Sequence, residues 1–105
     1  MNDPIGQAIY DYHFTGKADI IRVDTNYTEN EEIDPAWFFR SSTLMPVLER
    51  QALDLCRGDV LDAGAGAGCH SLELQNRGFR VMSLERSALA AEVMKDRGVK
   101  QVVCA

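Results

Sequence analysis

The sequence predicts an α/β fold in which short parallel strands alternate with helices. From residue 59 onward, apolar runs of strand length alternate with stretches of helical periodicity, in the order strand, helix, strand, helix, strand. A glycine-rich turn, residues 64–68, joins the first of these strands to the first helix. Two βα units followed by a strand imply a parallel sheet, because parallel neighbours need a long crossover connection and a helix supplies it.

Residues 1–57 are expected to form a helical cap or lid segment. Asp3 suits the N-cap of a helix and Pro4 suits the first helical position. These two residues predict a helix over residues 3–13, which Gly16 then interrupts.

Two different patterns follow the first helix. Residues 20–23 are mostly β-branched and apolar, which is typical of a strand, whereas the acidic residues 29–32 are typical of a loop or a solvated helix start. Asp34 and Pro35 form a second cap pair, which opens a short helical stretch over residues 36–40.

A longer helix is predicted over residues 44–55. Ser41, Ser42 and Thr43 offer its cap, and Pro46 is tolerated only in its first turn. The predicted apolar face of this helix carries Leu48, Ala52 and Leu55.

Residues 58–105 carry the alternating part of the fold. Its predicted elements are a strand at 59–63, a helix at 68–77, a strand at 80–85, a helix at 88–97 and a strand at 100–104. Ser87 caps the second helix, and Gly98 supplies the left-handed residue after it. Right-handed crossovers predict the spatial strand order 3-2-1, with the glycine-bearing strand at one side.

Composition excludes several classes of protein. The 105 residues are 46% hydrophobic and 26% charged, which is ordinary for a globular domain. A formal net charge of −5 argues against a surface that follows nucleic-acid phosphates. No apolar run approaches the length of a membrane span, and the N-terminus does not resemble a signal peptide. Three widely spaced cysteines fit free thiols, so we expect a reducing, cytoplasmic location.

The stretch Val-Leu-Asp-Ala-Gly-Ala-Gly-Ala-Gly, residues 60–68, has the character of a nucleotide-type binding corner. Its glycines let a ligand approach the backbone, and the helix that follows offers unpaired N–H groups. A dinucleotide places its pyrophosphate at such a helix, usually with the spacing G-x-G-x-x-G. Here Gly68 comes one residue too early for that spacing, and Asp62 adds negative charge nearby. These features favour S-adenosylmethionine, a cofactor with an amine, a sulfonium and no phosphate.

A second acid completes the pattern, because the strand at 80–85 ends in Glu85, about 20 residues beyond the glycines, where an acid can accept bonds from both ribose hydroxyls. With VLDAGAGAG at 60–68, HSLELQNRGFRV at 70–81 and LERS at 84–87, the sequence resembles the class I S-adenosylmethionine-dependent methyltransferases. The resemblance covers about residues 58–105. It implies a Rossmann-like three-layer fold, of which this chain would hold the first half of the cofactor domain.

The candidate cofactor-binding residues are Asp62, Ala63, Gly64, Ala65, Gly66, Gly68, His70, Glu85 and Arg86. Asp62 is expected near the methionine amine, directly or through another residue, and Glu85 at the ribose. His70 is expected to be structural or cofactor-adjacent. A metal site is not indicated, because Cys69 and His70 are adjacent and no partner spacing follows. No catalytic residue is identifiable.

Three functions stay open at this point. The first is the S-adenosylmethionine-binding part of a methyltransferase whose acceptor, a small molecule or a protein, is unknown. The second is a segment of a dinucleotide-binding oxidoreductase, and the third is a non-catalytic binding or assembly module. The resemblance implies a larger sheet, so we expect a truncated piece that is inactive alone. Its open strand edge is expected to cause self-association.

Overall fold

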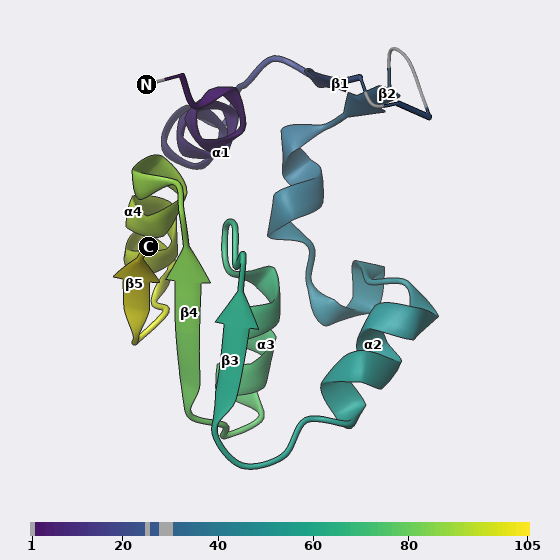
Figure 1. The fold of residues 1–105 in the computed structure, drawn as a ribbon, viewed down its shortest axis with the longest axis vertical. Coiled ribbons are helices and arrows are strands. Elements are labelled where there is room, and N and C mark those ends of the chain that lie inside the picture. The colour runs from purple at the N-terminus through teal and green to yellow at the C-terminus, as the bar shows by residue number, and fades with distance from the viewer. Residues whose placement is uncertain (1, 25, 28–30) are drawn as a thin grey trace.

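The computed structural model describes residues 2–24, 26–27 and 31–105, and its centre is a three-stranded parallel sheet (Figure 1). The strands are β3 (Val60–Ala63), β4 (Val81–Glu85) and β5 (Val102–Cys104), and they lie side by side in that order. The crossover helices are α3 (Cys69–Asn76) and α4 (Ala88–Arg97). The predicted α/β class and parallel sheet are therefore confirmed.

One face of the sheet is buried beneath helices, and the other is exposed. In the parallel register, Leu61 lies opposite Met82, and these side chains are 60% and 39% exposed. Val81 and Ser83 point to the other face, where they are buried beneath the helices, and Leu74 of α3 packs against Val81. Among the described residues no helix covers the face of Leu61, so they form two layers, and the three-layer arrangement that the resemblance implied stays a prediction.

Helix α1 (Pro4–Thr15) lies beyond the carboxyl ends of the strands and packs along α4 (Figure 1). Its predicted caps are confirmed: an Asp3 carboxylate oxygen accepts the N–H of Gly6 at 3.0 Å, and Gly16 ends the helix in a left-handed conformation. Ile9, 1% exposed, anchors α1 in a core cluster with Ala67 and residues of α4. This docking brings the first turn of α1 to the end of the sheet where the glycine turn lies.

The segment after α1 differs from its prediction. Strand β1 (Ile21–Val23) pairs antiparallel with a second strand, β2 (Glu31–Ile33), so a loop or helix start is wrong for residues 31 and 32. Residues 29 and 30 lie outside the described residues. The acidic composition suggested exposure correctly, but the strand conformation comes from pairing across the sheet, which local composition does not encode.

The helix predicted over residues 44–55 is also shorter than expected. Two 3-10 helices, η1 (Pro35–Phe39) and η2 (Ser42–Leu44), precede α2 (Val47–Asp54). Met45 is extended, with a ψ angle of 141°, because a residue before proline is driven out of the helical region. Pro46, with a ψ angle of 154°, is the non-helical N-cap of α2. The predicted apolar face is wrong too: Leu48 and Leu55 are 78% and 75% exposed, and Leu53 is the leucine of α2 that enters the core.

None of the helices within the described ranges has the length and apolar character needed to cross a bilayer.

Candidate functional site

The glycine turn leaves the carboxyl end of β3 with three residues in left-handed conformations. Gly64, Gly66 and Gly68 have φ angles of 69°, 59° and 88°. No atom lies within 4 Å of the position that a Cβ would take at Gly64, and the nearest atom to such a Cβ at Gly66 is Phe38 Cδ1, at 3.7 Å. The first two glycines therefore present open backbone, as a closely bound ligand requires.

Gly68 has a different reason to be glycine. A Cβ at this position would lie 2.9 Å from Met94 Cγ and 2.9 Å from Val99 Cγ2. These atoms belong to the packed junction between α4 and the residues that follow it. Gly68 is thus required by the close packing of the start of α3 against α4, a role that its spacing in the sequence did not reveal.

Glu85 reaches back to the glycine turn from the end of β4. One carboxylate oxygen accepts the N–H of Gly66 at 2.7 Å, and the other accepts the N–H of Ser87 at 2.8 Å. A carboxylate has about four lone-pair positions, so each oxygen keeps the capacity to accept a further bond from a ligand hydroxyl. The Glu85 carboxylate therefore holds the glycine turn in place and can still accept hydrogen bonds from a ligand.

A cleft of about 690 Å³ opens at this point, within the range of small-molecule sites. Of the predicted residues, Gly64, Gly66, Glu85 and Arg86 line it. The opposite wall comes from the first turns of α1 and from η1, and it was not predicted from the sequence. Gly6 was the available signal, since a glycine inside a predicted helix indicates a close approach by another part of the chain.

The remaining predicted residues do not line the cleft. The Asp62 carboxylate accepts a bond from the Ser71 hydroxyl at 2.7 Å, and that hydroxyl lies 2.6 Å from the hydroxyl of the fully buried Ser83. Asp62 thus holds β3 to α3 and β4. Ala63 is exposed at the end of β3, and Ala65 is buried in the core with Met94.

His70 belongs to an ionic cluster behind the loop. Its Nε2 lies 2.7 Å from a Glu49 carboxylate oxygen, and the Arg40 guanidinium binds both oxygens of Glu49 at 2.8 and 2.9 Å. Arg40, followed by His70, holds the pKa of Glu49 below its ordinary value. Burial raises the pKa of the neighbouring Cys69 thiol, although Arg40 and Arg97 oppose that shift. His70 is therefore a structural residue that joins α3 to α2, and the described residues contain no metal-binding cluster.

The depressed pKa of Glu49 gives a pH prediction. Its ionised form stabilises the folded chain above the ordinary value of about 4.5, and this contribution is lost as the pH falls through the lower folded pKa. The free energy of unfolding of Glu49→Gln should therefore fall below that of wild type near neutral pH, and the gap should close in acid. Urea denaturation across the acid range measures both proteins. A gap that persists under strongly acidic conditions would contradict the assignment.

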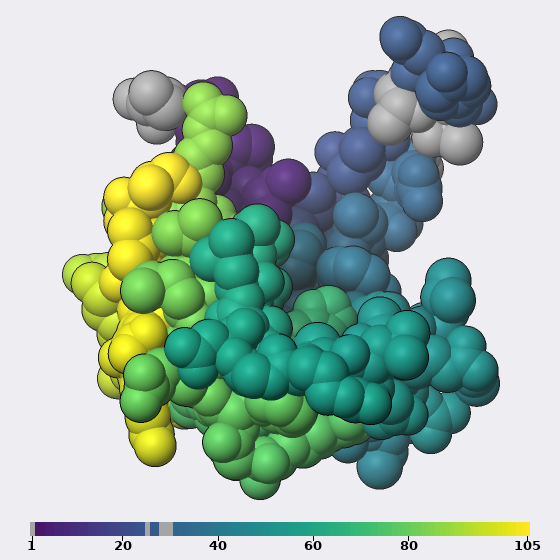
Figure 2. Space-filling model, turned by 60° about the horizontal axis from the view of Figure 1, so that its bottom comes forward, coloured from purple at the N-terminus to yellow at the C-terminus, as the bar shows by residue number. Residues whose placement is uncertain are grey.

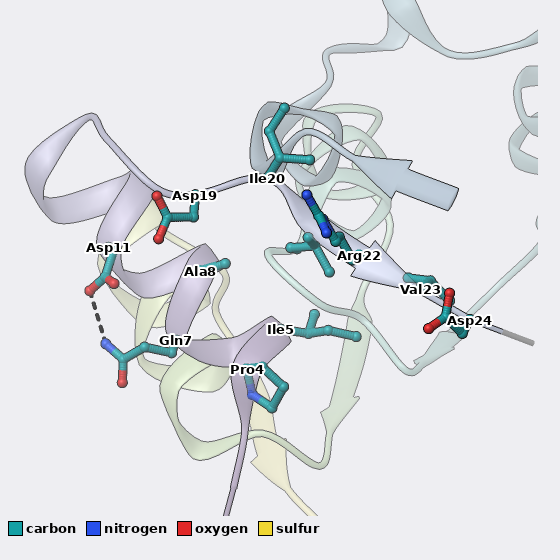
Figure 3. A pocket seen from close by; sticks show the side chains of 11 residues that line it. Pro4, Ile5, Gln7, Ala8, Asp11, Asp19, Ile20, Arg22, Val23 and Asp24 are labelled. Carbon is teal, nitrogen blue, oxygen red and sulfur yellow. Dashed lines mark hydrogen bonds between the residues drawn. The ribbon is translucent and has the colours of Figure 1, made fainter. Parts of the chain in front are cut away.

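A second cavity of about 560 Å³ lies on the other side of α1 (Figure 3). Ile5 and Ala8 of α1 line it on one side, and Ile20, Arg22 and Val23, in β1 or just before it, line the other. Asp11, Asp19 and Asp24 are also among its lining residues. Figure 2 shows the surface hollowed between the N-terminal segment, in purple, and the segment that contains β1 and β2, in blue. Ile5 lines both cavities, so the two adjoin at the first turn of α1.

A strand, a left-handed glycine turn, a helix start and an acid on the next strand are together the features of a cofactor cleft of nucleotide type. The chain is similar to a S-adenosylmethionine-dependent methyltransferase from Bacteroides fragilis, whose structure contains S-adenosyl-L-homocysteine. The two are 46% identical with a TM-score of 0.89, over 95% of this chain and 41% of that one. The predicted resemblance to these methyltransferases is therefore confirmed.

Two further solved structures align less well. One, from work on the conversion of a disulfide bond into a thioacetal group during echinomycin biosynthesis, is 33% identical over 55% of this chain and 26% of its own, with a TM-score of 0.48. The tRNA (uracil-54, C5)-methyltransferase of Pyrococcus abyssi is 23% identical over 82% and 24%, also with a TM-score of 0.48. No protein-family model and no curated protein matches this chain. The chain spans 41% of the length of the Bacteroides protein, and the proposals below rest on that structure.

Proposed function

We propose that this chain is the S-adenosylmethionine-binding part of a methyltransferase. The observation that carries the proposal is the cleft between Gly64, Gly66 and Glu85, in a chain 46% identical to a methyltransferase with bound S-adenosyl-L-homocysteine. The residues fit the cofactor, because two glycines leave open backbone and Glu85 keeps free acceptor positions. The two carboxylates of the lining, Asp3 and Glu85, outnumber its one guanidinium, Arg86, which favours a ligand with an amine and a sulfonium over a pyrophosphate.

Each part of the cleft has a role in this proposal. Gly64 and Gly66 admit the methionine end of the cofactor, Glu85 accepts the ribose hydroxyls, and the first turn of α1 excludes water from the other side. When bound, the cofactor supplies a methyl group on a sulfonium, which a nucleophilic acceptor takes by in-line attack. The chain contributes position and electrostatics to that step. The acceptor stays unidentified, as does any catalytic base.

Calorimetric titration separates this function from that of a dinucleotide-binding oxidoreductase segment. The 105-residue chain should bind S-adenosyl-L-homocysteine and should show no response to NAD at the same concentration. The loop lacks the G-x-G-x-x-G spacing of a pyrophosphate site, and the Asp3 and Glu85 carboxylates in the cleft wall should repel a pyrophosphate. Binding of NAD with a better affinity would support a dinucleotide-binding segment, and a response to neither ligand would support a non-catalytic assembly module.

We further propose that the chain self-associates through β3. In the described residues the outer edge of β3 has no partner strand, and Leu61, Met82 and Val103 leave apolar surface exposed beside it. Sedimentation velocity should show dimers or larger species for wild type and a monomer for Leu61→Lys. Leu48→Lys, on the exposed surface of α2, is the matched control and should still assemble. A monomeric wild-type chain would end this proposal.

A further inference from the structure

Helix α1 is tied to α4 at two places. Beside the cleft, the Ser87 hydroxyl donates to an Asp3 carboxylate oxygen at 2.5 Å. Near the other end of both helices, His13 Nε2 lies 2.7 Å from an Asp96 carboxylate oxygen. Asp3 and Ser87 line the cleft, whereas neither His13 nor Asp96 does. Both contacts therefore hold α1 against α4, but only the Asp3–Ser87 contact lies at the cleft.

The tie beside the cleft is continuous with Glu85. Ser87 donates its backbone N–H to one oxygen of Glu85, and the other oxygen of Glu85 accepts the N–H of Gly66. On the opposite side, the second oxygen of Asp3 accepts the N–H of Gly6. An unbroken series of hydrogen bonds thus runs from the first turn of α1, through Asp3, Ser87 and Glu85, to the glycine loop. Because each side chain in the series bonds to the next, holding one of them in place restricts the orientation of its neighbour.

Gly6 shows how closely the two helices approach. It is buried, and a Cβ added to it would lie 2.1 Å from the Ser87 hydroxyl oxygen and 2.2 Å from an Asp3 carboxylate oxygen. Its φ is not in the left-handed region, so glycine is needed here for space alone. The backbone of α1 therefore rests directly on the Asp3–Ser87 contact, without room for an alternative arrangement.

We propose that Asp3 and Ser87 are positioning residues for the cofactor. They hold the first turn of α1 as a wall of the cleft, and they orient the Glu85 carboxylate between the glycine loop and the ligand. They act through Glu85 and α1 and take no part in methyl transfer. This inference rests on the proposed function, because it concerns the same cleft.

Two variants break the tie without removing Glu85. Asp3→Ser keeps an N-cap for α1, but the shorter side chain does not reach Ser87. Ser87→Ala removes the hydroxyl and leaves the backbone N–H for Glu85. Calorimetry should show the Kd for S-adenosyl-L-homocysteine raised about tenfold in each, the effect of one charge-assisted hydrogen bond. Ser87→Thr, which keeps the hydroxyl, should restore the affinity.

His13→Gln is the matched control, because it breaks the remote tie of the same two helices. Its melting temperature should fall less than that of Ser87→Ala, which also removes the N-cap of α4, and its Kd should stay within about twofold of wild type. Equal weakening in His13→Gln, or unchanged affinity in both cleft variants, would overturn the positioning role.

Hydrogen exchange at the Gly66 amide tests the same network without a ligand. Exchange should be faster in Asp3→Ser and Ser87→Ala than in wild type, and unchanged in His13→Gln. A wild-type chain that fails to bind S-adenosyl-L-homocysteine would refute the proposed function. Unchanged exchange at Gly66 in the two cleft variants would refute the network itself, so the two failures are distinguishable.

Discussion

Replacement of Gly66 by valine is expected to abolish measurable binding of S-adenosyl-L-homocysteine. At a φ of 59° the valine would be held in a left-handed conformation, and its branched side chain would enter the space between the loop and Phe38. The ligand would lose its approach to the backbone. Calorimetry and thermal unfolding measure the two effects separately.

Gly78→Val provides the control for backbone strain. Gly78 is also left-handed, with a φ of 94° and open space around it, but it follows α3 and does not line the cleft. This variant should lose comparable stability, of the order of 1–2 kcal/mol, and keep its affinity. If Gly66→Val binds as tightly as wild type, the glycine turn is structural and the cleft is not the cofactor site.

Substitution of Glu85 by alanine should weaken cofactor binding by about 1.5–3 kcal/mol, as expected for charged hydrogen bonds to ribose hydroxyls. Thermal stability should fall as well, because Glu85 also satisfies the N–H groups of Gly66 and Ser87. Glu92→Ala removes the same charge from an exposed position of α4 and should change neither property. Unchanged affinity in Glu85→Ala would remove the ribose role.

The elements that the sequence predicted well are those with local start and stop signals. Asp3 with Pro4 begins α1, Ser87 begins α4, and Gly98 ends it, each through contacts within a few residues. The elements that were missed depend on more distant partners. Strand β2 exists because β1 pairs with it, and α2 starts later than predicted because Pro46 forces Met45 into an extended conformation.

The residues of the candidate site also fall into two groups, those that local sequence patterns predict and those that depend on distant partners. Gly64, Gly66 and Glu85 could be found because the loop and the acid follow consecutive strands, and parallel strands bring their carboxyl ends together. Asp3 and Ser87 were each recognisable as a helix cap, but their contact joins residues that are 84 positions apart. No periodicity or spacing encodes such a tertiary contact. The partner of His70 could not be predicted for the same reason, since Glu49 comes from another helix.

Amide mapping by NMR is the most direct test of the claim that the glycine loop and Glu85 bind the cofactor. During titration with S-adenosyl-L-homocysteine, the amides of Gly64, Gly66 and Ser87 should shift together with one binding curve. The amides of Gly16, at the far end of α1, and Gly58, before β3, should stay in place. Saturable binding that shifts Gly16 or Gly58 and leaves Gly64, Gly66 and Ser87 unchanged would place the cofactor elsewhere and contradict the account.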